Sequence, residues 1–125
     1  MKTTPCKLEA RLIDAYAAVD EATEAVETAT ETLHGAKAAL DSCRNEKTAT
    51  ESARLKSEGL NVDAQKAAIN HLCACEVQAV TEADADVRTA NRSLAKAASE
   101  QELCRALLRV MECQVGLRRQ KRDLH

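Results

Sequence analysis

One short stretch of the sequence, INHLCACEVQ (residues 69–78), contains the residue types that bind metals or exchange disulfides. It places His71, Cys73 and Cys75 within five positions. On a helix, residues four apart share a face, so only His71 and Cys75 point in one direction. A closed zinc site needs four ligands, and this face offers two. The spacing therefore predicts no metal site within the chain, and no cofactor is expected.

Catalytic motifs are missing from the rest of the sequence. It has no glycine-rich phosphate loop, no nucleophile elbow and no H-E-x-x-H pair. The 125 residues include no Trp, no Phe, one Tyr and one Pro, and they are rich in Ala, Glu, Lys, Arg and Thr. That composition is typical of long helices, whose narrow contacts leave no room for a substrate pocket. We therefore expect a protein that is not an enzyme.

A heptad repeat follows the helix start at Thr4-Pro5 and predicts one long helix. Leu or Val fills the first core position of successive heptads, and Ala fills most of the second. Near the end of this helix polar residues take the core positions. Either a stutter turns Ala49 and Ala53 inward there, or that end packs loosely. The core positions of the repeat are Leu8, Leu12, Ala15, Val19, Ala22, Val26, Ala29, Leu33, Ala36, Leu40 and Cys43.

Gly59 and Asn61 mark a turn between two helices. Gly adopts the left-handed conformation that ends a helix, and Asn caps the next one. The heptad pattern then resumes, and a short connection makes the two helices antiparallel neighbours. The predicted fold class is all-α: a long antiparallel helical hairpin with an Ala-rich coiled-coil seam, able to dimerise into a four-helix bundle. The expected elements of this single domain (1–125) are helix one at about 5–57, the turn at about 58–61 and helix two at about 62–122.

The position of the turn sets the register of the two helices. If Glu58 and Gly59 lie at its centre, Leu33 faces Ala83 and Val26 faces Ala90. A large side chain then meets a small one in successive layers, which allows close approach without voids.

Cys43 and Cys73 face each other in the same register. They are either small apolar core residues or a disulfide, which requires Cα atoms within about 7 Å. Six cysteines would suit an oxidised, secreted chain. The first ten residues, MKTTPCKLEA, lack the apolar segment of a signal peptide. We therefore favour free thiols and a cytoplasmic location, with the disulfide as the alternative.

Apolar side chains outside the seam gather near the open end of the predicted hairpin, where helix two extends past helix one. Contiguous exposed apolar surface usually marks an interface. Two hairpins can associate there, or helix two can break near Ser99 so that residues 101–124 fold back as a third helix. The uninterrupted heptads across Ser99 favour association. The expected interface comprises Ile13, Tyr16, Leu103, Leu107, Val110 and Leu117.

Three functions are compatible with this pattern. The first is a non-catalytic coiled-coil interaction or scaffold module that binds a protein partner or a second copy. The second is a small secreted or surface helical protein stapled by disulfides. The third is a helical chaperone of the tubulin-cofactor type, suggested by size and helix class alone. No apolar run reaches the length of a membrane span. Nucleic acid is not expected, because the basic stretch GLRRQKRDLH has no aromatic residue for base stacking.

Overall fold

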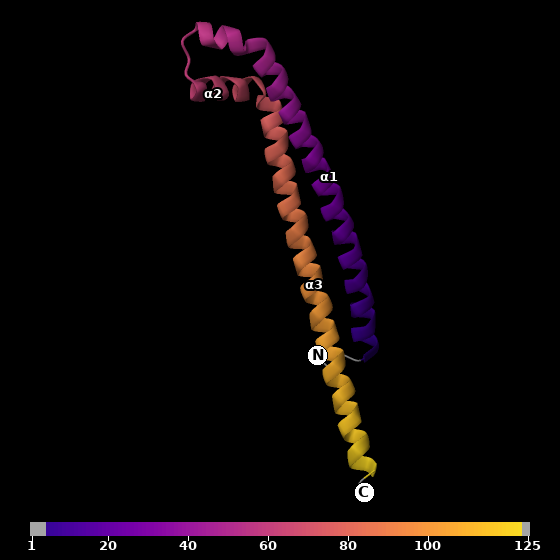
Figure 1. The fold of residues 1–125 in the computed structure, drawn as a ribbon. Coiled ribbons are helices and arrows are strands. Elements are labelled where there is room, and N and C mark those ends of the chain that lie inside the picture. Colours follow the sequence, from indigo (N-terminus) through magenta and orange to yellow (C-terminus); the bar gives the residue numbers. More distant parts are fainter. Residues whose placement is uncertain (1–4, 124–125) are drawn as a thin grey trace. The chain divides into compact units, whose positions relative to one another are not determined.

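The computed structural model describes residues 5–123, and side chains from 6 to 120. Three helices account for nearly all of this range: α1 (Pro5–Ser57), α2 (Val62–Leu72) and α3 (Ala74–Asp123) (Figure 1). No strand is present among the described residues, and α1 packs against α3. The predicted all-α helical hairpin is therefore confirmed. The predicted cap Thr4 lies outside the described residues.

The chain divides into two compact units, which are described separately. The open-end unit contains residues 5–26 of α1 and 90–123 of α3. The turn unit contains residues 27–89, which include α2 and a segment of each long helix. The predicted alternative of a third helix after a break near Ser99 is not what the structure has, because α3 continues through that residue.

The heptad seam is the least exposed line on both long helices. Every seam position from 8 to 43, and the corresponding positions from 69 to 111, is buried or half-buried. In the open-end unit Leu8 and Ala15 are almost fully buried, and in the turn unit Leu33 and Ala83 are buried. Stability in both units therefore comes from a narrow line of mainly apolar contacts between large and small residues.

The turn between α1 and α2 has the predicted chemistry. Gly59 has φ of +77°, and its N–H donates to Lys56 O at 3.0 Å while the N–H of Leu60 donates to Leu55 O at 3.4 Å. These two bonds form a Schellman motif, which satisfies carbonyls at the end of α1. The Asn61 side chain accepts a bond from Ala64 N at 2.8 Å and caps α2. The predicted roles of Gly59 and Asn61 are confirmed.

The predicted inward turn of Ala49 and Ala53 near the end of α1 is wrong. Ala49 and Ala53 are exposed, whereas Glu51 is half-buried and Leu55 is only 2% exposed. Beyond the seam, burial recurs at Lys47, Glu51 and Leu55, in steps of four residues. A stutter is present, but it turns Leu55 inward because burying a leucine removes more apolar area from water than burying an alanine.

The predicted second helix is interrupted at Cys73. This residue has φ of −102° and ψ of 27°, and its N–H donates to Ile69 O and Asn70 O at the end of α2. α3 then begins with a bond from Val77 N to Cys73 O at 2.9 Å. Figure 1 shows α2 beside the C-terminal part of α1 and at an angle to the first turns of α3. Residues 60–115 contain neither Gly nor Pro, so no local helix breaker explains the interruption.

Cys43 and Cys73 form a disulfide across this interruption, with Cα atoms 6.1 Å apart. The prediction of two free thiols is therefore wrong, since the Cα separation lies within the range of a disulfide. The register nevertheless places the two residues opposite each other, as expected for one layer of the seam. The covalent bond therefore ties α1 to the junction of α2 and α3.

Candidate interaction surface

The six apolar residues predicted to form an interface all lie in the open-end unit, and all are exposed. Their exposure ranges from 36% for Leu107 to 67% for Ile13. Val115, on the same end of α3, is 45% exposed. The unit therefore presents several large apolar side chains to solvent in addition to its buried seam.

These residues lie on two sides of the seam. Two contacts between α1 and α3 define the sides: Arg11 pairs with Glu100 on one, and Tyr16 contacts Arg105 on the other. We call the first side the leucine flank, because heptad spacing places Leu103, Leu107, Val110 and Leu117 there. We call the second the tyrosine flank; it carries Tyr16 and Ile13. The predicted residues therefore form two surfaces separated by the seam.

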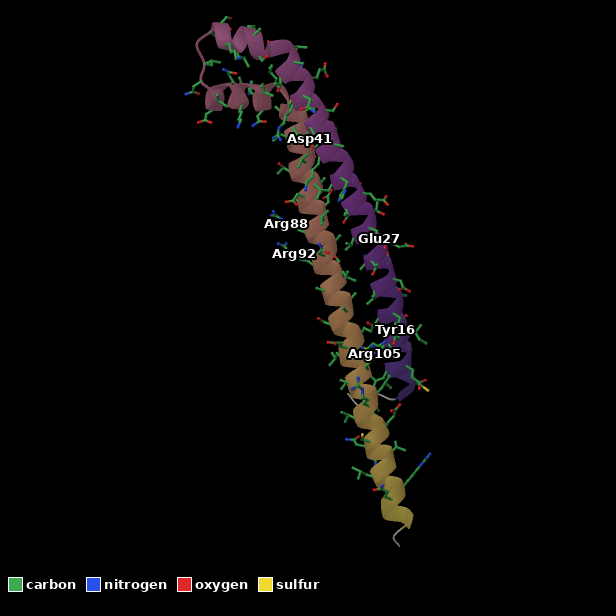
Figure 2. The ribbon with its side chains drawn as sticks, viewed as in Figure 1. Tyr16, Glu27, Asp41, Arg88, Arg92 and Arg105 are labelled. Carbon is green, nitrogen blue, oxygen red and sulfur yellow. A yellow bond between two sulfur atoms is a disulfide. The ribbon has the colours of Figure 1, made fainter. Side chains whose placement is uncertain are left out.

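The tyrosine flank has a partner within the chain. The Tyr16 hydroxyl accepts bonds from Nε of Arg105, at 3.0 Å, and from Nη2. The Arg105 guanidinium carbon also lies 5.1 Å from the centroid of the Tyr16 ring, within the range of a cation–π contact. Figure 2 shows the two side chains directed toward each other. Sequence reasoning missed Arg105, although its heptad position matches that of Tyr16.

The leucine flank carries a shallow groove of about 600 Å³ between α1 and α3. Ala15 and Ala97 are seam residues, and they form part of its floor because their side chains are too short to fill the space. The lining residues are Ala15, Ala18, Ser93, Lys96, Ala97, Ser99, Glu100 and Leu103. Leu103 is therefore both the end of the groove and the start of the exposed leucine row.

An ion pair borders this groove. Nε of Arg11 donates to Oε1 of Glu100, and the two side chains are 43% and 39% exposed. The hydrogen bond from Arg11 lowers the pKa of Glu100, and the same bond raises the pKa of Arg11. Because both groups are exposed, solvent screens the pair, and its contribution to stability is small.

Cys104 lies beneath the Arg11–Glu100 pair. It has no exposed surface, and its Sγ donates to Glu100 Oε1 at 3.6 Å. Burial raises the pKa of the Cys104 thiol, which reduces the thiolate fraction at neutral pH. This cysteine is a core residue with low reactivity.

His71 and Cys75, the two potential metal ligands that share a helix face, are both exposed. Among residues 5–123 no group of three or more potential metal ligands comes together. In the same range no helix has the length and apolar character needed to cross a bilayer.

Comparison with protein-family models, curated proteins and solved structures finds no match to this chain.

Proposed function

We propose that this protein is a non-catalytic coiled-coil interaction module that binds another helical protein surface through its leucine flank. The observation that supports this is the exposed row of Leu103, Leu107, Val110 and Leu117 on one helix. Successive residues of this row are four, three and seven positions apart. Core positions of a heptad repeat have the same spacing. A helix that recognises another helix presents apolar residues at such spacings.

The energetics favour a partner for this row. Fully burying one leucine or valine side chain contributes about 1.5–3 kcal/mol. The four residues of the row are 36–62% exposed, so burying the rest of each side chain against a partner would contribute a part of that energy. Exposed apolar side chains gathered on one side of a helix often mark a protein-binding site.

The experiment compares partners captured by the tagged wild type with those captured by Leu107→Glu/Val110→Glu. Val62→Glu is the matched control, because Val62 is 65% exposed but lies in the turn unit. We expect the double variant to lose bound proteins that the wild type and Val62→Glu retain, with helical content unchanged by circular dichroism. Identical binding by all three chains would contradict the proposed site.

The Cys43–Cys73 disulfide supports a second proposal, a small secreted or surface helical protein with one covalent staple. Cys6, Cys75, Cys104 and Cys113 are free thiols in this state. The discriminating measurement is thiol counting on protein taken from its source cells. Six thiols would support a reducing compartment, and four thiols with a Cys43–Cys73 peptide would support an oxidising one.

A further inference from the structure

We propose that the turn unit binds a phosphate monoester group in a hollow between α1 and α2. The hollow has a volume of about 360 Å³ and is lined by Arg44, Thr48, Lys66, Ile69 and Asn70. Figure 1 shows α2 beside the C-terminal part of α1, and the two helices share the walls of this hollow. We call it the arginine hollow. It shares no residue with the leucine flank, so neither proposal depends on the other.

The arginine hollow contains positive charge without a counter-ion. Arg44 is half-buried and Lys66 is exposed, and neither forms an ion pair with a carboxylate among the described side chains. None of the described side chains that line the hollow is acidic. Asp41 and Asp63, each three residues before one of the two cations, are exposed and do not line it. A concave site with one sign of charge attracts ions of the opposite sign.

A hydrogen bond between the two helices orients the donors of this site. Nε of Arg44 donates to Oδ1 of Asn70 at 2.9 Å. In the described part of the chain the Nη atoms of Arg44 and Nδ2 of Asn70 form no bond, so their N–H groups are available to a ligand. The Thr48 hydroxyl donates to Arg44 O at 2.6 Å and is not counted as a donor to the ligand. An arginine that is already oriented loses less conformational freedom when it binds an anion.

The number and origin of the donors favour phosphate over carboxylate. The two Nη atoms of a guanidinium match two oxygens of either group. A phosphate monoester has a third terminal oxygen and carries nearly two negative charges at neutral pH, which suits the additional donors Lys66 Nζ and Asn70 Nδ2. These two donors come from α2, whereas Arg44 comes from α1. A tetrahedral group offers oxygens outside one plane to donors from two helices, and a planar carboxylate does not.

The test is an NMR titration of the isotope-labelled chain with inorganic phosphate and with O-phosphoserine, at constant ionic strength. The Nε–H signal of Arg44 and the side-chain amide signals of Asn70 report on the site directly. We expect these signals to shift and saturate, with a dissociation constant for inorganic phosphate of about 1–10 mM. Acetate, which is planar and carries one charge, should bind at least about tenfold more weakly.

Matched variants separate this site from general attraction to positive charge, and circular dichroism checks that each one folds. Arg44→Gln should weaken phosphate binding at least about tenfold, and Arg44→Lys, which keeps the charge but loses the paired donors, about threefold to tenfold. Lys66→Gln should weaken it about threefold. It should leave the fold intact, because Lys66 is exposed and forms no bond with the described residues. Lys56→Gln removes another exposed charge of the turn unit that does not line the hollow, and it should leave binding unchanged.

The outcomes decide the site and its ligand. If neither phosphate probe produces saturable shifts at Arg44 and Asn70 at about 50 mM, the site is overturned. Equal weakening by Lys66→Gln and Lys56→Gln also overturns it, because binding would then follow net charge alone. Acetate binding as strong as phosphate binding overturns the phosphate assignment. Tighter binding of O-phosphoserine than of inorganic phosphate supports a phosphate carried on an organic molecule, and the reverse order supports the free ion.

Discussion

Removing the Cys43–Cys73 disulfide should lower the free energy of unfolding by about 3.6 kcal/mol. The two cysteines are 30 residues apart in sequence. For a closed loop of that length, the lost entropy of the unfolded chain corresponds to about 3.6 kcal/mol at 25 °C. The change to make is Cys43→Ala/Cys73→Ala, because Cys73 is fully buried and alanine keeps its site apolar.

Urea unfolding followed by circular dichroism at 222 nm measures this difference. The slope of stability against urea is about 1–3 kcal/mol per molar for small proteins, so the midpoint should fall by about 1–4 M. The wild type treated with an excess of a dithiol reductant should unfold at the same midpoint as the alanine variant. The reductant should leave the midpoint of the variant itself unchanged.

Cys75→Ala is the matched control, because Cys75 is two residues from the bond, exposed and unpaired. Its unfolding midpoint should stay within experimental error of the wild type. If the Cys43→Ala/Cys73→Ala chain and the reduced wild type both unfold at the oxidised wild-type midpoint, the disulfide does not constrain the unfolded chain and the reasoning fails.

The Cys43–Cys73 disulfide should also keep α2 and α3 from joining into one continuous helix. Without a Gly or Pro nearby, residues on both sides of Cys73 can form one continuous helix once the cross-link is gone. Spin labels at the exposed positions Lys66 and Gln78 would then be separated by about 18 Å along the helix axis. We expect the measured distance to lengthen toward that value on reduction. An unchanged distance would show that packing against α1, and not the disulfide, maintains the interruption.

Three further predictions concern single residues. Ala83→Leu should overpack the seam and cost about 1–3 kcal/mol in urea unfolding, whereas Ala85→Leu, at an exposed position, should have little effect; equal effects would contradict the seam. Gly59→Ala should cost about 1–2 kcal/mol because φ is +77°, and Gly35→Ala should stabilise the helix interior by about 0.5–1 kcal/mol; neither added methyl meets another atom within 4 Å. Cys104 should react with a thiol reagent only on unfolding, because it is buried and its pKa is raised; rapid labelling of the native protein would show that this site opens.

Much of the fold could be predicted because its determinants are local. The heptad period identifies the buried side of each long helix from spacing alone. Gly59 and Asn61 act through their own backbone and side-chain geometry, so their roles are visible in the sequence. The relative position of Cys43 and Cys73 follows from these same features, since the turn and the period together fix the register.

Three features of the structure were not predicted, and each depends on more than the local sequence. The interruption at Cys73 has no local cause and coincides with a bond to a residue on another helix. Leu55 is buried while Ala49 and Ala53 are exposed, although a strict heptad repeat does not place Leu55 in the seam. The contact of Tyr16 with Arg105 required the flank positions of both helices to be considered together.

The alanine seam gives a physical reason for the leucine flank. Small seam residues bring α1 and α3 close together, and each layer of the seam buries little apolar area. In the open-end unit the large residues Leu103, Leu107, Val110 and Leu117 lie outside that seam, where the hairpin leaves 36–62% of each residue exposed. The same alanines leave the groove beside Ala18 and Ala97 open. The groove and the exposed leucine row therefore lie next to each other on the same unit. This arrangement is expected if a further helix packs against the unit.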